Sequence, residues 1–239
     1  MEKTPKTMLD QLIHFDQQLL LALNGSESVY WDGIWMTITT VGTWILFFFA
    51  LFVVLMRSND MRNLLLIILM LGLAILLADQ GASGVCKPLF HRFRPTHEPA
   101  LMGLVDVVDD YRGGFYGFMS SHAANGFAIC TFLSLVIRHY LATTTLISYA
   151  VLSSYSRIYL GVHYPGDILC GALWGILCAF LVYRLYVYLR SRLHSSRQFL
   201  SSAYTRSGVL IDDVHLIPAA FSVTLLYVFF RALFYSLNH

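Results

Sequence analysis

Charged residues are scarce in this sequence. Asp, Glu, Lys and Arg make up 13% of its 239 residues, whereas about 25% is usual in soluble globular chains. Hydrophobic residues make up 57%, and the mean hydropathy is +0.62. A soluble domain could not stay hydrated with so little polar surface, so we expect a bilayer to surround most of the chain. The formal net charge of +2 is too small to indicate a nucleic-acid partner.

Residue patterns typical of metal sites and disulfides are also missing. The cysteines lie in or beside apolar runs, at Cys86, Cys130, Cys170 and Cys178. They form no CxxC pair and no disulfide-like spacing, so we interpret them as small apolar packing residues. The sequence contains no carboxylate cluster suited to Mg²⁺ and no His/Cys spacing suited to Zn²⁺. We therefore expect neither a metal nor another cofactor.

Internal repeats and low-complexity tracts are absent as well, so we expect residues 1–239 to form one membrane-embedded domain. A series of apolar runs predicts an all-α fold with six transmembrane helices. The expected spans are residues 33–56, 63–86, 120–137, 141–160, 165–189 and 216–237. The longer polar connections between them are residues 87–118 and 190–215.

Residues 8–24 have a different pattern, with leucines at helical spacing opposite polar side chains. The segment is shorter than the ~20 residues that a span requires, and Asp16 interrupts its apolar stripe. These features predict an amphipathic helix that lies in the membrane interface and ends at Asn24 and Gly25.

Three polar clusters stand at the ends of the expected spans. The first is KPLFHRFRP (87–95), the second is MSSH (119–122) and the third is SRIYLGVHYPGD (156–167). In a six-span bundle, the ends of the second to fifth spans that carry these clusters share one membrane face. The order of the spans therefore brings the ionisable residues of the clusters together: Lys87, Arg94, His122, Arg157, His163 and Asp167.

The cations of these clusters indicate an anionic ligand. Guanidinium groups such as Arg94 and Arg157 match the oxygens of a phosphate group, and Lys87 adds a third positive charge. Ser120 and the backbone N–H groups at the start of the third span add further donors, because a helix N-terminus favours anions. The sequence therefore predicts a phosphate site.

The remaining polar residues of the clusters can carry out chemistry on such a phosphate. Two histidines, His122 and His163, can supply a nucleophile and a general acid. Asp167 follows His163 by one helical turn, so its carboxylate can orient the imidazole and support its cationic form.

The clusters resemble the signature motifs of the type-2 phosphatidic acid phosphatase superfamily, which are K-x6-R-P, P-S-G-H and S-R-x5-H-x3-D. The first and third motifs match in full. In the second, Met119 and Ser121 replace the usual Pro and Gly, whereas Ser120 and His122 are kept. The resemblance covers residues 30–190, so the first helix and the C-terminal extra span at 216–237 lie outside it.

The resemblance implies a metal-independent phosphatase that forms a phosphohistidine. His163 is then the nucleophile, Asp167 orients it, and His122 protonates the leaving group. The residues implied to hold the phosphate are Lys87, Arg94, Ser120, Ser121 and Arg157. How closely the backbone N–H of Ser121 approaches the phosphate then depends on its small side chain, which the usual glycine lacks.

A site at the ends of the spans lies at headgroup depth, so the expected substrate is a phosphate or diphosphate ester of a membrane lipid. Undecaprenyl diphosphate is favoured, with phosphatidylglycerol phosphate, phosphatidic acid and lipid A phosphates as further possibilities. A phosphatase of a soluble phosphate ester is the first alternative. The second is a membrane transporter, which the concentration of charged residues at one face disfavours. The pattern does not indicate an oligomeric state.

Polar residues at positions that the motifs do not specify are interpreted as ordinary loop or span residues. In the connection between the second and third spans they are His91, Arg92, His97, Asp106, Asp109 and Asp110. Within the spans, Asp79 and Arg231 are likewise given no catalytic role.

The distribution of Lys and Arg predicts that the site faces the periplasm from a bacterial inner membrane. Outside the spans, the side without the site carries Arg57, Arg62, Arg138, Arg190, Arg192, Arg197 and Arg206. Apart from the site cations, the side with the site carries only Lys3, Lys6, Arg92 and Arg112. An excess of cations marks the cytoplasmic side.

A single cysteine placed at residue 104 should therefore react with a membrane-impermeant maleimide in cells with a permeable outer membrane. Labelling only after lysis would reverse the orientation.

Overall fold

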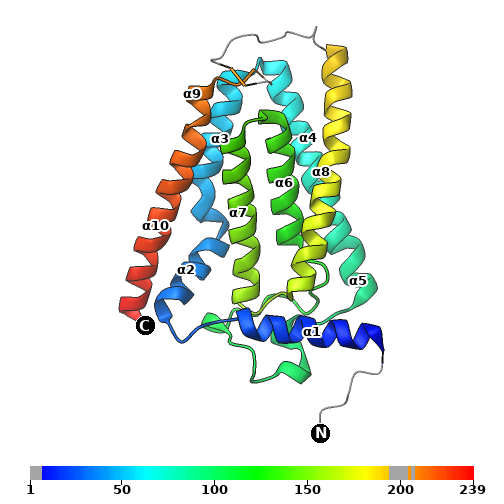
Figure 1. Ribbon diagram of the computed structural model, residues 1–239, viewed down its shortest axis with the longest axis vertical. Coiled ribbons are helices and arrows are strands. Elements are labelled where there is room, and N and C mark those ends of the chain that lie inside the picture. Colours follow the sequence, from blue (N-terminus) through cyan, green and yellow to red (C-terminus); the bar gives the residue numbers. More distant parts are fainter. Residues whose placement is uncertain (1–6, 194–203, 206–207) are drawn as a thin grey trace.

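The chain folds into long helices that run side by side, and α1 lies across one end of them (Figure 1). This computed structural model describes residues 7–193, 204–205 and 208–239. Within those residues there is no β-strand, only isolated bridges such as the one between Phe93 and Tyr116. The predicted all-α class is therefore confirmed.

Most helices lie close to the predicted segments. The N-terminal part consists of α1 (Met8–Leu23), α2 (Val29–Thr39), the 3₁₀ turn η1 (Val41–Trp44) and α3 (Ile45–Ser58). Next, α4 (Met61–Asp79) continues through the π-helical η2 (Gln80–Cys86) into α5 (Lys87–Phe90). The short 3₁₀ turns η3 (Pro95–His97), η4 (Pro99–Leu101) and η5 (Val108–Asp110) follow. The rest consists of α6 (Ser121–Ile137), α7 (Tyr140–Tyr159), α8 (Pro165–Leu193), α9 (Ile211–Val214) and α10 (Leu216–Asn238).

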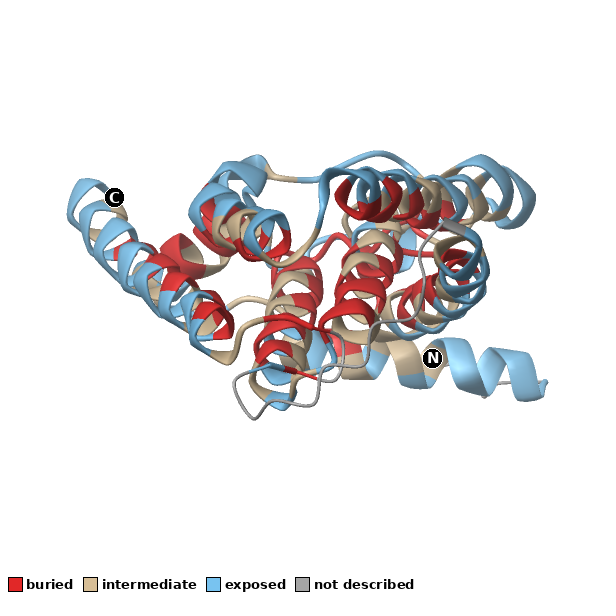
Figure 2. Ribbon diagram, turned by 90° about the horizontal axis from the view of Figure 1, so that it is seen from above, coloured by how far each residue is buried: buried red, intermediate tan, exposed pale blue. Residues whose placement is uncertain are grey.

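The helices have the length and surface of a membrane bundle. Within the described residues, four stretches are long and apolar enough to cross a membrane, namely Val41–Ser58, Met61–Phe90, Pro165–Arg192 and Ile211–Asn238. Their buried residues gather where helices meet, and their outer faces are exposed (Figure 2). Those outer faces carry large apolar side chains, among them Phe49, Leu69, Leu177, Phe230 and Phe234. Such a surface suits lipid, and it would be unfavourable in water.

α6 and α7 fall outside this set of four. α6 is apolar but has only 17 residues, and α7 has 20 residues but is less apolar. Both are packed between other helices, α6 against α4, α7 and α8, and α7 against α2 and α6. A helix enclosed by other helices needs less apolar surface than one that faces lipid. The prediction of six spans stays a prediction.

The first expected span, residues 33–56, is not one continuous helix, and that prediction was wrong. α2 ends at Thr39, and side chains further along the chain bond the carbonyls of its last turns. Thr43 Oγ1 donates to Thr37 O at 2.7 Å, and Trp44 Nε1 donates to Ile38 O at 2.8 Å. These bonds supply side-chain donors to carbonyls at the end of the helix, where the backbone ladder stops inside the apolar interior. The chain can therefore change direction inside the bundle.

α1 forms where the sequence predicts it. A capping box starts the helix, because Thr7 Oγ1 accepts from Asp10 N while Asp10 Oδ2 accepts from Thr7 N. Near the other end of α1, Leu20 is fully buried against the bundle. The exposed side of α1 is apolar and includes Met8, Leu12 and Phe15. Its location in the membrane interface remains an inference from this face and from its direction across the bundle.

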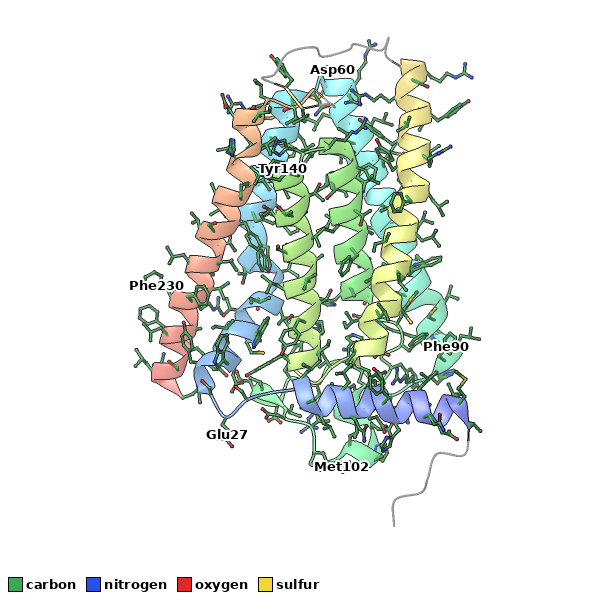
Figure 3. All side chains as sticks on the ribbon, in the orientation of Figure 1. Glu27, Asp60, Phe90, Met102, Tyr140 and Phe230 are labelled. Atoms are coloured by element: carbon green, nitrogen blue, oxygen red, sulfur yellow. The ribbon has the colours of Figure 1, made fainter. Side chains whose placement is uncertain are left out.

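The two ends of the bundle carry different segments. Asp60 and Tyr140 lie at one end, whereas Glu27, Phe90 and Met102 lie at the end that α1 crosses (Figure 3). Of the cations that we expect on the cytoplasmic side, the described ones lie at the end with Asp60: Arg57, Arg62, Arg138, Arg190 and Arg192. Four of the residues counted for the orientation, Lys3, Lys6, Arg197 and Arg206, lie outside the described residues.

Two glycines of α8 allow it to pack unusually close to α6. Ideal Cβ atoms built on Gly171 and Gly175 would collide with the backbone carbonyl oxygens of Ser120 and Ala124. The two glycines are four residues apart and therefore share one face of α8. This contact holds the start of α6 beside the start of α8, where the second and third motifs lie.

Replacing Gly175 by Ala should destabilise the protein, because the new methyl group meets backbone atoms that cannot move aside. We expect a loss of about 1–3 kcal/mol, the usual cost of overpacking. Gly72→Ala is the matched control, since a Cβ at Gly72 in α4 meets nothing within 4 Å. Thermal unfolding of the two variants in detergent should show a lower Tm only for Gly175→Ala. Equal Tm values would contradict the close contact.

Candidate active site

Residues of all three motifs gather at the end of the bundle that α1 crosses. Lys87 begins α5, Ser121 and His122 begin α6, Arg157 lies in the last turn of α7, and Asp167 lies in the first turn of α8. Direct bonds link the segments. Lys87 Nζ donates to Ser121 Oγ at 3.2 Å, and Ser120 N donates to Asp167 O at 3.1 Å. The juxtaposition predicted from the order of the spans is therefore present in the structure.

His163 and Asp167 form a buried pair. His163 Nδ1 lies 3.4 Å from Asp167 Oδ2, and the two side chains are 1% and 0% exposed. Asp167 Oδ2 also accepts from the backbone N–H of Tyr164 at 3.1 Å. With Nδ1 turned toward the carboxylate, Nε2 is the nitrogen that the ring can offer to an electrophile.

The surroundings of His163 favour its neutral form. The residue lies in the connection between α7 and α8. Burial, followed by the positive charges of Arg94, Arg157 and Lys87, lowers the pKa of His163 well below its ordinary value. The imidazole is therefore unprotonated at neutral pH, which is the form that can attack an electrophile.

Arg157 reaches across to two segments far away in the sequence. Its Nη1 donates to Thr39 Oγ1 at 2.6 Å and to Tyr111 Oη at 2.9 Å. Its Nε is buried and bonds to no protein atom. Sequence reasoning did not identify Thr39 or Tyr111, because neither stands in a motif.

Arg94 has a similar environment. Its Nε donates to Tyr116 O at 3.2 Å, whereas its Nη1 is buried and bonds to no protein atom. Leaving a buried charged donor unsatisfied usually costs ~1–3 kcal/mol or more. Two such donors, on Arg94 and on Arg157, lie in the same site. Such donors suit an anion that accepts from both.

The two serines of the second motif have distinct contacts. Ser120 is the N-cap of α6, and its Oγ accepts from Ala123 N at 3.4 Å. Ser121, which replaces the usual glycine, accepts a bond from Lys87, and Lys87 Nζ also donates to Ser83 Oγ at 3.1 Å. Ser121 therefore fixes the position of a cation, which a glycine could not do. His122 follows Ser121 and interacts electrostatically with Arg157, His163, Arg94 and Lys87.

The interpretation of Arg92 as an ordinary loop residue was wrong. Its Nη1 donates to Asp167 Oδ1 at 2.9 Å, and its Nη2 donates to Asp16 Oδ2 at 2.8 Å. The sequence contains one indication of this position. Phe93 pairs with Tyr116, so the segment around it is extended, and residues two apart in an extended segment point to the same side. Arg92 stands two residues before the motif residue Arg94, so the two side chains are expected on the same side of the segment.

Asp109, also interpreted as a loop residue, connects this region to the C-terminal helix. Tyr235 of α10 donates to Asp109 Oδ2 at 2.6 Å.

Over the described part of the chain, no group of three or more His, Cys, Asp or Glu side chains could hold a metal ion. The site thus consists of cations, histidines, hydroxyl groups and one buried carboxylate.

Comparison with known proteins identifies the family of the chain. The family model of the PAP2 superfamily matches residues 63–191, more than half of the chain and all three motifs. The chain belongs to the PAP2 superfamily. The superfamily resemblance drawn from the motifs is thereby confirmed, and the chain is a membrane phosphatase of this superfamily.

Two curated relatives cover most of the chain. The lipid A 4'-phosphatase of Porphyromonas gingivalis is 36% identical over 184 residues, which is 77% of this chain and 78% of the relative. The lipid A 4'-phosphatase of Bacteroides thetaiotaomicron is 34% identical over 189 residues, 79% of this chain and 84% of the relative.

A solved structure shares the fold. It is the first transmembrane PAP2 type phosphatidylglycerolphosphate phosphatase from Bacillus subtilis, with a TM-score of 0.57 and 20% sequence identity. The match covers 80% of this chain and 91% of that one. This similarity supports the fold of a membrane-embedded PAP2 protein.

Proposed function

We propose that this PAP2 superfamily member hydrolyses a phosphate monoester of lipid A through a phosphohistidine on His163. The observation that carries the chemistry is the pair of buried, unpartnered guanidinium donors on Arg94 and Arg157 beside a buried neutral histidine. This arrangement suits a tetrahedral anion bound next to the imidazole ring.

The first step transfers the phosphoryl group to the protein. His163 Nε2 attacks phosphorus, so that a P–N bond forms while the bond from phosphorus to the lipid oxygen breaks. His122 gives its proton to the departing lipid alkoxide. Asp167 stabilises the positive charge that develops on His163.

The second step releases phosphate. Water attacks the phosphohistidine and gives a proton to His122, the P–N bond breaks, and inorganic phosphate leaves. In both steps Lys87, Arg94 and Arg157 hold the non-bridging oxygens, with the N–H groups at the start of α6 beside them. Catalysis of this kind rests on positioning and on preorganised charge.

Two observations support a lipid substrate. The site lies at the end of the bundle, at the level where a headgroup would stand, and α1 presents exposed apolar residues at that same end. Both curated relatives above are named lipid A 4'-phosphatase, and each match covers more than three quarters of both chains.

Those relatives favour lipid A over the undecaprenyl diphosphate that was expected before the comparison. Three cations can hold either a monoester or a terminal diphosphate, so the site residues do not separate the two. Both relatives are bacterial proteins, and the excess of Lys and Arg at the opposite end of the bundle favours a cytoplasmic location for that end. The proposal therefore places the protein in the bacterial inner membrane, with the site facing the periplasm.

The phosphohistidine mechanism predicts that activity survives EDTA and that vanadate, which forms trigonal-bipyramidal adducts with imidazole, inhibits. His163→Ala should lose kcat by several orders of magnitude, as is usual for loss of a nucleophile. His139→Ala, at the opposite end of the bundle, is the matched control. Quenching a reaction with ³²P-labelled substrate in alkali should trap label on the wild type and not on His163→Ala. A requirement for Mg²⁺, or an active His163→Ala variant, would refute the scheme.

The substrate proposal predicts the highest kcat/KM for lipid A in mixed micelles. The comparison set is undecaprenyl diphosphate, phosphatidylglycerol phosphate, phosphatidic acid, glucose 6-phosphate and p-nitrophenyl phosphate. Mass spectrometry of the lipid A product identifies which phosphate has been removed. Equal or higher efficiency on the soluble esters would rule out a lipid substrate. A higher kcat/KM for another lipid would rule out lipid A as the preferred substrate and would leave a lipid substrate in place.

A further inference from the structure

Asp16 lies in α1, outside every motif, and it contacts the active site directly. Its Oδ1 accepts from the backbone N–H of Gly166 at 2.7 Å, and its Oδ2 accepts from Arg92 Nη2 at 2.8 Å. Gly166 immediately precedes Asp167. A Cβ at Gly166 would lie 2.7 Å from Asp16 Oδ2, so the glycine leaves room for the carboxylate in this position. The carboxylate that interrupts the apolar stripe of α1 therefore has a structural reason.

Arg92 links Asp16 to the catalytic pair His163 and Asp167. Its guanidinium lies 4.0 Å above the ring of Tyr164, which keeps it in one orientation. One Nη reaches Asp16 and the other reaches Asp167 Oδ1. Burial disfavours the charged form, but the carboxylates of Asp167 and Asp16 outweigh it, so the pKa of Arg92 lies above its ordinary value.

The two oxygens of Asp167 thus have separate partners. Oδ1 accepts from Arg92, and Oδ2 faces His163 Nδ1. If Arg92 moved, Asp167 would lose the charge that compensates it and could rotate away from the imidazole. Asp16 prevents that movement by holding the second Nη of Arg92.

We propose that Asp16 is a positioning residue for phosphoryl transfer: through Arg92 it holds Asp167 in the orientation that directs His163 at phosphorus. This inference rests on the proposed phosphohistidine function. It makes α1 part of the active site, although the resemblance to the superfamily does not extend to that helix.

The orientation of a nucleophile affects the rate of the chemical step more than it affects the binding of substrate. Asp16→Ala should therefore lower kcat about 10- to 100-fold, as expected for a small misplacement of reacting groups, with KM within about threefold of the wild type. Asp10→Ala is the matched control on the same helix, because Asp10 bonds only the start of α1. It should leave kcat nearly unchanged.

A double-mutant cycle with Arg92→Ala tests whether Asp16 acts through Arg92. Asp16→Ala combined with Arg92→Ala should be no slower than Arg92→Ala alone, because the two residues form one chain of contacts. Asp16→Asn, which keeps the shape but removes the charge, should fall between Asp16→Ala and the wild type. It serves as the second variant if Asp16→Ala folds poorly.

The cycle is run in the full-length protein with p-nitrophenyl phosphate as well as with lipid A, and Tm is measured for each variant. Failure of lipid A as a substrate leaves the cycle measurable on the soluble ester. Absence of a trapped phosphohistidine in the wild type counts against the proposed function itself. A kcat within twofold of the wild type for Asp16→Ala, or losses that multiply in the double variant, would overturn the role of Asp16.

Discussion

A fully buried carboxylate at the start of α8 is the constraint on which the site depends. An uncompensated charge in such a place would be strongly unfavourable. Asp167 is accommodated because Arg92, the N–H of Tyr164 and His163 all approach it. His163 and Tyr164 belong to the third motif, whereas Arg92 lies within the first, so compensating one charge draws these two motifs together. Through Arg92, α1 is also held in place.

The close packing of α6 against α8 supplies the second requirement. Because Gly171 and Gly175 leave room for the backbone of α6, the first turn of that helix stands next to Asp167. The donors of this turn and the cation Lys87, held by Ser121, then face the same space as His163. The polar site lies at the end of the bundle, so its charges avoid the centre of the bilayer, where they would be most costly.

Sequence patterns predicted the parts of the structure that depend on local spacing. The all-α class, the position of α1 and the neighbourhood of His163 and Asp167 follow from helical periodicity and from a separation of four residues. The contacts of Arg157 with Thr39 and Tyr111 could not be predicted in this way. The contact with Thr39 depends on the bend between α2 and α3, which hydroxyl and indole groups stabilise by bonding carbonyls inside the bundle. The contact with Tyr111 depends on how the connection between α5 and α6 folds. Hydropathy alone does not register such bonds.

The sequence by itself predicted the chemistry proposed for this protein, because the residue types and spacings of three motifs are those of a phosphate site with two histidines and an orienting carboxylate. It also determined that the chain is helical and embedded in a membrane, because so few charges leave no other solvent. Only the tertiary structure decided which groups hold that chemistry in place. Arg92, Asp16 and Ser121 acquire their roles from contacts across 34 to 150 positions of sequence. Contacts at such separations depend on how helices pack, and no local pattern encodes that packing.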